Sequence, residues 1–284
     1  MSDTQTATRS RRLVWTGAGM PASDGAGVKL NRIIGQPALP DLDPFLMLDE
    51  FGSDDPKAYI AGFPSHPHRG FETVTYMLAG RMRHKDNAGN EGLLGPGSVQ
   101  WMTAGRGIVH SEMPEQESGL MQGFQLWVNL PAKDKMTAPR YQDIAADRVP
   151  AADLGGGVSV RVLAGEIAGV KGPVDPGATQ PIFLDVTLAP GAAATIPLPA
   201  GHNAFVYVYE GEAGVGDAAE ALARGRIGVL SPGDEVRLGS DAGARLILVA
   251  GKPLREPVAK YGPFVMNTQA ELRQAFEDYR AGRF

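Results

Sequence analysis

The chain has 284 residues, with 27 Lys and Arg against 32 Asp and Glu, a net charge of −5 and no Cys. The length suits two domains, and 43% hydrophobic residues let each half bury a core. No basic excess is available to neutralise phosphates, so direct nucleic-acid binding is not expected. The absence of Cys excludes disulfides, thiolate metal sites and a cysteine nucleophile, and it fits a cytoplasmic location.

The polar segment 1–11 lacks the apolar run of a secretion signal and is predicted to be a disordered tail. No stretch approaches the roughly 18 apolar residues of a membrane span, so no membrane contact is expected. Beyond the tail, short runs bounded by Gly, Pro or Asn are typical of strands; in 71–78, β-branched and aromatic residues dominate. Four strands are predicted in the first half, at 28–34, 72–78, 98–103 and 123–129.

The segment 131–150 is polar and bounded by prolines, so it is predicted to link two domains, at 12–135 and 136–284. The 37 Gly and 22 Pro recur at intervals, as in a sandwich or barrel of short strands. The sequence therefore predicts an all-β fold in both halves. Five strands are predicted in the second half, at 182–188, 204–209, 227–230, 235–238 and 245–249.

One helix is predicted, over residues 268–281 at the C-terminus. Thr268 and Glu271 have the spacing of a capping box, in which each side chain binds the other residue's backbone amide. Leu272, Ala275 and Phe276 then recur at helical spacing and form one apolar face. This helix is expected to close against a barrel and to have a structural role.

The chemistry is concentrated in two short motifs, His66-x-His68 and His110-x-Glu112. Side chains alternate between the faces of a strand, so each motif aims both of its polar groups the same way. Two neighbouring strands could then direct four ligands to one point inside a barrel. Three imidazoles and a carboxylate suit a divalent metal such as Fe, Mn, Ni, Cu or Zn, with open positions for substrate or dioxygen.

Glu72 competes with Glu112 for the place of the carboxylate ligand. It shares parity with His66 and His68, so on an unbroken strand it also faces inward. From the residues alone, either glutamate could ligate the metal or accept a proton beside it. Phe63, Arg69 and Arg106 flank the motifs and are predicted to line a substrate pocket.

The second half is predicted to be a copy that binds no metal. Alignment of the halves on Gly80 with Gly211, and on Pro96-Gly97 with Pro232-Gly233, replaces every ligand position by a group that cannot bind metal. One metal per chain is therefore expected. The replacements are Pro197 and Pro199 for His66 and His68, and Leu246 and Leu248 for His110 and Glu112.

Four longer motifs resemble the signature of the pirin family, within the cupin superfamily: 66–76, 105–112, 123–131 and 261–268. The resemblance runs from about residue 12 to the end. It implies two cupin (jelly-roll) β-barrel domains packed face to face, only the first of which holds a metal, usually iron. By motif position the resemblance assigns the ligands His66, His68, His110 and Glu112, and leaves Glu72 beside the site.

The resemblance also implies a function. It predicts a quercetin 2,3-dioxygenase-type enzyme that opens a flavonol or similar enol with O2 at Fe(2+), with Mn, Ni, Cu, Zn or Co as alternatives. Glu112 or Glu72 would accept the hydroxyl proton of the substrate. The alternative is a non-enzymatic iron- or redox-sensing regulatory protein that binds partner proteins. A cytoplasmic monomer is expected in either case.

Overall fold

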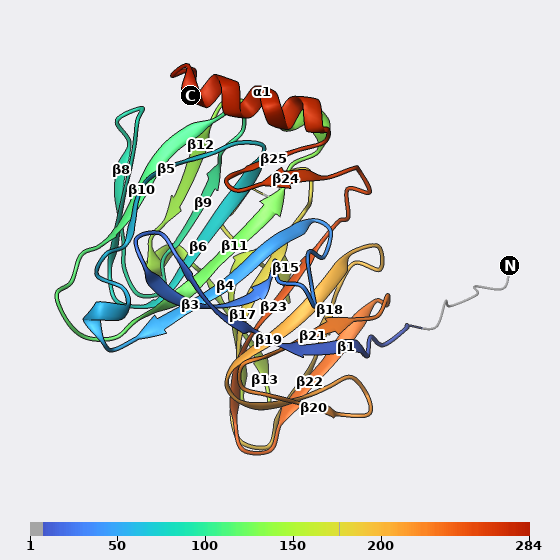
Figure 1. The fold of residues 1–284 in the computed structure, drawn as a ribbon. Coiled ribbons are helices and arrows are strands. Elements are labelled where there is room, and N and C mark those ends of the chain that lie inside the picture. The colour runs from blue at the N-terminus through green and yellow to red at the C-terminus, as the bar shows by residue number, and fades with distance from the viewer. Residues whose placement is uncertain (1–7, 176) are drawn as a thin grey trace, which may run out of the picture. The chain divides into compact units, whose positions relative to one another are not determined.

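The computed structural model describes residues 8–175 and 177–284, and these form two compact units. The first unit comprises Gly19–Val149 and Leu254–Phe284. The second comprises Pro150–Pro253 together with the described residues up to Ala18. Strands dominate both units, and the predicted all-β fold is confirmed (Figure 1). No helix in the described ranges has the length and apolar character needed to cross a membrane.

Two antiparallel sheets build the first unit. The larger has the order β12-β9-β6-β11-β4-β3-β2, and the smaller β5-β10-β7-β8. The strands of the larger sheet are β2 (Met20–Asp24), β3 (Val28–Ile34), β4 (Phe45–Ser53), β6 (Phe71–Ala79), β9 (Val99–Thr103), β11 (Met121–Asn129) and β12 (Arg140–Ile144). Those of the smaller are β5 (Phe63–His68), β7 (Met82–Asp86), β8 (Glu91–Leu94) and β10 (Ile108–Pro114), and three short 3-10 turns lie at η1 (Pro56–Ala58), η2 (Ala132–Asp134) and η3 (Ala146–Arg148).

The second unit repeats this strand order. Its long path is β1-β21-β19-β23-β17-β14-β13, and β18, β22, the end of β19 and β20 form the other layer. Its elements are β1 (Leu13–Ala18), β13 (Ala151–Gly155), β14 (Val158–Ala164), β15 (Glu166–Ile167), β16 (Val170–Lys171), β17 (Ile182–Leu188), β18 (Ala192–Pro197), β19 (Asn203–Val215), β20 (Glu220–Ala223), β21 (Arg226–Leu230), β22 (Glu235–Ser240) and β23 (Ala244–Gly251).

This topology corrects the alignment of the two halves by one strand. β10 lies between β5 and β7, and the strand in the same place between β18 and β19 is β22. β23, which carries Leu246 and Leu248, corresponds to β11 instead. The buried residues of β22, Val236 and Leu238, are also apolar and lie in the core cluster of this unit. The residues of the second barrel that correspond to the β10 ligands are therefore apolar, as the alignment predicted, although they are not the residues that it named.

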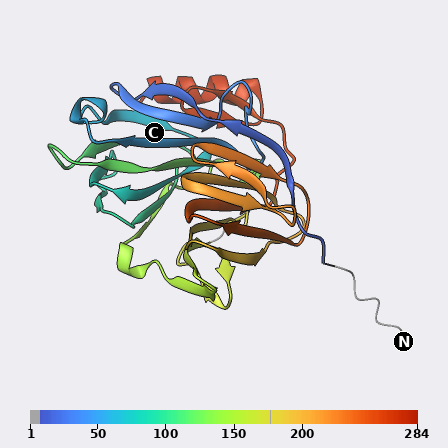
Figure 2. The same cartoon turned by 90° about the horizontal axis from the view of Figure 1, so that it is seen from below.

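The boundaries of the units differ from the predicted domains. The expected linker 131–150 contains β12, which pairs with β9 and completes the large sheet of the first unit. The C-terminal segment, expected in the second domain, belongs to the first unit. There the hairpin of β24 (Ala259–Tyr261) and β25 (Phe264–Met266) leads into α1 (Gln269–Arg280), drawn in red in Figures 1 and 2. Strand pairing between residues far apart in sequence decides this arrangement.

The disordered tail was predicted to extend to residue 11, but the structured part of the chain begins before that residue. Residues 1–7 lie outside the described part of the chain. Ser10 forms a β-bridge with Glu235, and Arg11 is buried in the second unit. The Arg11 guanidinium donates to four backbone carbonyls, those of Pro199, His202, Ser231 and Gly233, so its charge is solvated by the fold.

The predicted helix and its capping box are confirmed. Thr268 accepts from the Glu271 amide at 3.2 Å, and Glu271 accepts from the Thr268 amide at 2.9 Å. Leu272 and Ala275 are buried against Phe264 of β25. The apolar face of the helix therefore covers the hairpin that precedes it.

A buried lysine attaches this hairpin to the first unit. Lys135 Nζ donates to the carbonyls of Gly70 (2.7 Å) and Val265 (3.1 Å) and to Asn129 Oδ1 (2.7 Å). Burial lowers the pKa of Lys135 to about 8, and three oxygen acceptors match the three donors of its ammonium group. Lys135 thus joins β25 to the start of β6 and the end of β11.

Candidate functional site

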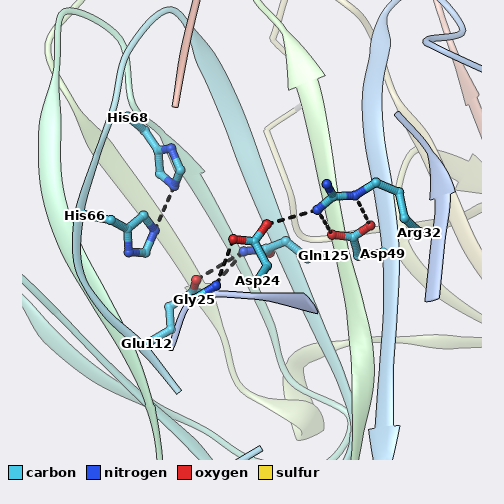
Figure 3. A network of polar contacts seen from close by, with 8 residues as sticks. All are labelled: Asp24, Gly25, Arg32, Asp49, His66, His68, Glu112 and Gln125. Atoms are coloured by element: carbon cyan, nitrogen blue, oxygen red, sulfur yellow. Dashed lines mark hydrogen bonds and ion pairs between the residues drawn. The ribbon is translucent and has the colours of Figure 1, made fainter. Parts of the chain in front are cut away.

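Three of the predicted ligands come together at the centre of the first unit. His66 and His68 point the same way from β5, and His110 lies directly opposite His66 on β10. Ligand nitrogens of all three lie within 4.8 Å of one another. The Nε2 atoms of His66 and His68 are 3.0 Å apart (Figure 3). The alternation of side chains along a strand therefore predicted this convergence correctly.

The state of the imidazoles fits a divalent metal ion. His66 Nδ1 lies 2.8 Å from the Pro64 carbonyl, which can only accept, so Nδ1 is the donor and Nε2 is the ring nitrogen that faces His68. Neither ring nitrogen of the buried His110 has a hydrogen-bond partner among the described residues. Burial, with the neighbouring histidines, lowers the pKa of His68 and of His110, so both are neutral at pH 7. Neutral nitrogen donors are what such an ion requires.

Glu112 lies beside the histidine cluster, and its carboxylate is held by two other side chains. It is 2% exposed and is not one of the group whose ligand atoms fall within 4.8 Å. Its Oε1 lies 3.0 Å from Thr75 Oγ1, and its Oε2 accepts from Gln125 Nε2 at 3.2 Å. These bonds fix the carboxylate in the cavity wall, two residues along β10 from His110.

Thr75 and Gln125 belong to a row of polar residues that crosses the large sheet. Residues directly opposite one another on paired strands share a face, and Glu112 marks this face as the interior of the barrel. The rows on either side are mostly apolar; one contains Met47, Trp127 and Met102. From β3 to β12 the polar row runs Arg32, Asp49, Gln125, Thr75, Gln100 and Asp143.

A cavity of about 810 Å³ opens onto His66, His68 and Glu112. Its volume is within the range of pockets that bind drug-sized molecules. Phe63, which the sequence predicts for a substrate pocket, lines this cavity together with Phe51, Trp127 and the β24–β25 hairpin. The polar end of the cavity includes Asp24, Arg32, Asp49 and Gln125 (Figure 3).

The structure places Glu72 away from this cavity. Gly70, with φ +88°, lies in the turn between the end of β5 at His68 and the start of β6 at Phe71. A β-carbon there would lie 1.9 Å from the Val265 carbonyl, so the turn requires glycine. The unbroken strand assumed for Glu72 does not exist. Because Thr75 faces the interior, Glu72 faces the opposite side of the sheet, where it accepts from Thr103 at 2.6 Å.

The two arginines predicted for the pocket do not line it. Arg69 is buried: Nη1 binds Asp278 of α1 at 2.6 Å, and Nε donates to the Arg106 carbonyl. Its guanidinium also lies 4.3 Å from the ring centroid of Phe284. The Arg106 side chain is exposed outside the cavity. Both predictions relied on nearness in sequence to the ligands, which does not decide where a side chain points.

The sequence analysis did not identify Arg32, Asp49, Thr75 or Gln125. Each lies an even number of residues from core residues of its own strand and therefore faces the interior with them. A polar residue at such an interior position is the signal in the sequence that could have found it. Asp49, for example, falls between the buried Met47 and Phe51. A buried polar side chain needs a partner, but the partner follows from strand register, which a single strand does not reveal.

Two barrels with one strand order, of which the first holds a histidine cluster beside a cavity, define a bicupin with a candidate metal centre. Family models described as Pirin and as Pirin C-terminal cupin domain match residues 27–128 and 183–284. The chain belongs to the pirin family.

Its relatives carry two kinds of name. A Pseudomonas aeruginosa protein with the provisional name quercetin 2,3-dioxygenase is 54% identical over 97% of this chain and 98% of its own length. Human pirin is 45% identical over 91% of this chain and 88% of its own length. A crystal structure described as quercetin 2,3-dioxygenase from Acinetobacter baumannii has a TM-score of 0.90 and 36% identity, and covers 97% of this chain and 98% of its own.

Proposed function

We propose that this protein is a metal-dependent dioxygenase of the quercetin 2,3-dioxygenase type. The observation that carries the proposal is the group of three imidazoles beside a large, mainly apolar cavity and the held carboxylate of Glu112. The names of close relatives support the same reaction class. In this reaction a flavonol takes up one O2, its central ring opens, and one carbon monoxide leaves.

His66, His68 and His110 would hold the metal, with Glu112 as the fourth protein ligand. Fe(2+) is the proposed ion, and Mn, Ni, Cu, Zn or Co could take the same donors. When bound, such an ion supplies Lewis acidity toward the enol hydroxyl of the substrate and a site for dioxygen. By accepting from His66 Nδ1, the Pro64 carbonyl leaves Nε2 directed inward, toward His68.

Glu112 is the proposed proton acceptor for the substrate hydroxyl. It is the only carboxylate of the described residues that both lines the cavity and lies on a strand that carries a metal ligand. The donors Thr75 and Gln125 fix its orientation. Trp127 and Phe63 supply apolar walls that keep water from the reacting ring. Glu72 is not proposed for this role, because it faces the opposite side of the sheet and accepts from Thr103.

The test is paired. Metal content and quercetin absorbance under air are measured for the iron-loaded protein and for His66→Ala and Glu112→Ala, with His202→Ala as a control that changes a buried histidine of the second unit. We expect about one metal per chain in the intact protein and in His202→Ala, and loss of that metal in His66→Ala. Quercetin should be consumed by the intact protein and by His202→Ala, but not by His66→Ala or Glu112→Ala. Metal without consumption would contradict the dioxygenase proposal and favour a metal-dependent regulator. No metal in the intact protein would overturn both.

A further inference from the structure

The polar row ends in the cavity at an ion pair that the metal chemistry does not use. Arg32 and Asp49 are directly opposite each other on β3 and β4. Arg32 donates from Nε to Asp49 Oδ1 at 2.9 Å and from Nη2 to Oδ2 at 2.7 Å. The Asp49 side chain is 2% exposed and that of Arg32 24%, so the guanidinium covers a buried carboxylate and faces the cavity.

A second carboxylate closes this arrangement. Asp24 on β2 accepts from Arg32 Nη2 at 3.0 Å through Oδ2 and from the Gly25 amide at 2.8 Å through Oδ1 (Figure 3). Its side chain is 52% exposed and lines the cavity. We call Asp24, Arg32 and Asp49 the distal subsite.

The distal subsite has hydrogen-bonding capacity left over. Arg32 Nη1, with two N–H groups, has no partner among the described residues, whereas Nε and Nη2 are both engaged. Each Asp24 oxygen accepts one bond and keeps a further lone pair. The subsite therefore presents a fixed donor next to a fixed acceptor.

Charge decides what such a pair can bind. Two carboxylates surround one guanidinium, so the subsite has a net charge of about −1 and would repel a carboxylate or phosphate group. A hydroxyl group is neutral, donates one hydrogen and accepts through its oxygen. Two adjacent hydroxyls on an aromatic ring could donate to Asp24 and accept from Arg32 together.

The polar row of the large sheet leads from the distal subsite to the side chains that hold Glu112 beside the candidate metal centre. Asp49 is the cross-strand neighbour of Gln125, which binds Glu112. Arg32 is thus two strands from Gln125, or about 10 Å at the usual strand spacing. Met47 and Trp127 form the adjacent apolar row along this distance. An aromatic molecule lying on that row would have one polar end at each site.

Building on the proposed function, we propose that the distal subsite binds the catechol end of the substrate, so that the enzyme selects aromatic enols with two adjacent hydroxyls on the ring remote from the metal. Asp24 accepts from one hydroxyl, and Arg32 donates from Nη1 to the oxygen of the adjacent hydroxyl. Asp49 positions Arg32 without touching the ligand.

Two flavonols test the proposal, quercetin with the catechol and galangin, which lacks hydroxyls on that ring. Their binding to the iron-loaded protein is followed without oxygen by quenching of tryptophan fluorescence, and turnover is measured under air. A hydrogen bond to a charged group changes affinity by about tenfold or more. We expect the intact protein to bind quercetin at least about tenfold more tightly than galangin. Asp24→Asn should remove most of that preference by weakening quercetin binding alone.

The control is Asp55→Asn, which changes another aspartate that accepts a local backbone amide but lies outside the cavity. It should leave the preference unchanged. Equal binding of the two flavonols by the intact protein would overturn the distal subsite, and so would an unchanged preference in Asp24→Asn. If both flavonols are also consumed at equal rates, the proposed function stands without it. If neither flavonol binds, both proposals fail.

Discussion

At the scale of single residues, the hydroxyl of Thr75 controls the orientation of the carboxylate. It lies 3.0 Å from Glu112 Oε1 and 2.7 Å from Gln125 Oε1, but it has one hydrogen and donates to one acceptor at a time. Gln125 Nε2 supplies the second donor to Glu112. Because Glu112 is buried, these two contacts replace the water that would otherwise solvate its charge.

Thr75→Val keeps the shape of the side chain and removes this donor. We expect kcat for quercetin to fall about tenfold or more, since a hydrogen bond to a charged group contributes about 1.5–3 kcal/mol. KM should change less than about threefold, and metal content should stay near one per chain.

The matched control is Thr103→Val. Thr103 donates to Glu72 in the same way, but on the opposite face of the sheet. It should leave kcat within about threefold. Equal losses of kcat in the two variants would show that the effect is structural and would contradict the role given to Thr75.

At the scale of elements, Arg69 joins a ligand strand to the C-terminal helix. It follows His68 directly and binds Asp278 of α1, while Arg283 binds the other oxygen of the same carboxylate. The side chain of Arg69 is 4% exposed and that of Arg283 is 54% exposed. The buried ion pair therefore joins the helix to the ligand strand, whereas the exposed pair lies within the C-terminal segment. Removal of one partner of the buried pair is expected to cost more stability.

Arg69→Met should lower the free energy of unfolding by about 2 kcal/mol, measured with urea, whereas Arg283→Met should lower it by less than about 1 kcal/mol. Hydrogen bonds from Arg69, then Arg283, lower the pKa of Asp278. Because its folded pKa is lowered, the carboxyl stabilises the fold above its usual pKa of 3.8, and this contribution is lost as pH falls below it.

The difference between Arg69→Met and the intact protein should therefore shrink below about pH 4. KM for quercetin should be unchanged, because Arg69 does not line the cavity. A large rise in KM without a loss of stability would restore the original prediction that Arg69 is a pocket residue.

At the scale of the whole molecule, each of the two units is built from two segments that are far apart in the sequence. The N-terminal strand β1 pairs with β21 of the second unit, and residues 254–284 belong to the first. The first unit thus depends on a segment from the C-terminal end of the chain. That segment brings the acceptor Val265 to Lys135, the partner Asp278 to Arg69 and one wall of the cavity.

A fragment of residues 19–149 should therefore fail to fold cooperatively or to bind metal at one equivalent. Co-expression with residues 254–284 should restore metal binding, measured by elemental analysis of the purified complex. The control is the full chain cut between Val149 and Pro150, which keeps every segment of both units and should keep its metal. Cooperative unfolding and full metal content in the fragment alone would show that the C-terminal segment is dispensable.

The sequence by itself determined the features that depend on near neighbours along the chain. Alternation placed His66 and His68 on one side of β5, and the capping box at Thr268 began the helix. The pairing of β10 with β5 then brought His110 opposite His66. Only the tertiary structure decided that Glu72 faces away, that Arg69 binds a helix, and that Arg32, Asp49, Gln125 and Thr75 form one row. Strand register and the return of residues 254–284 set these contacts, and both depend on pairing between distant segments, whose energy no local pattern encodes.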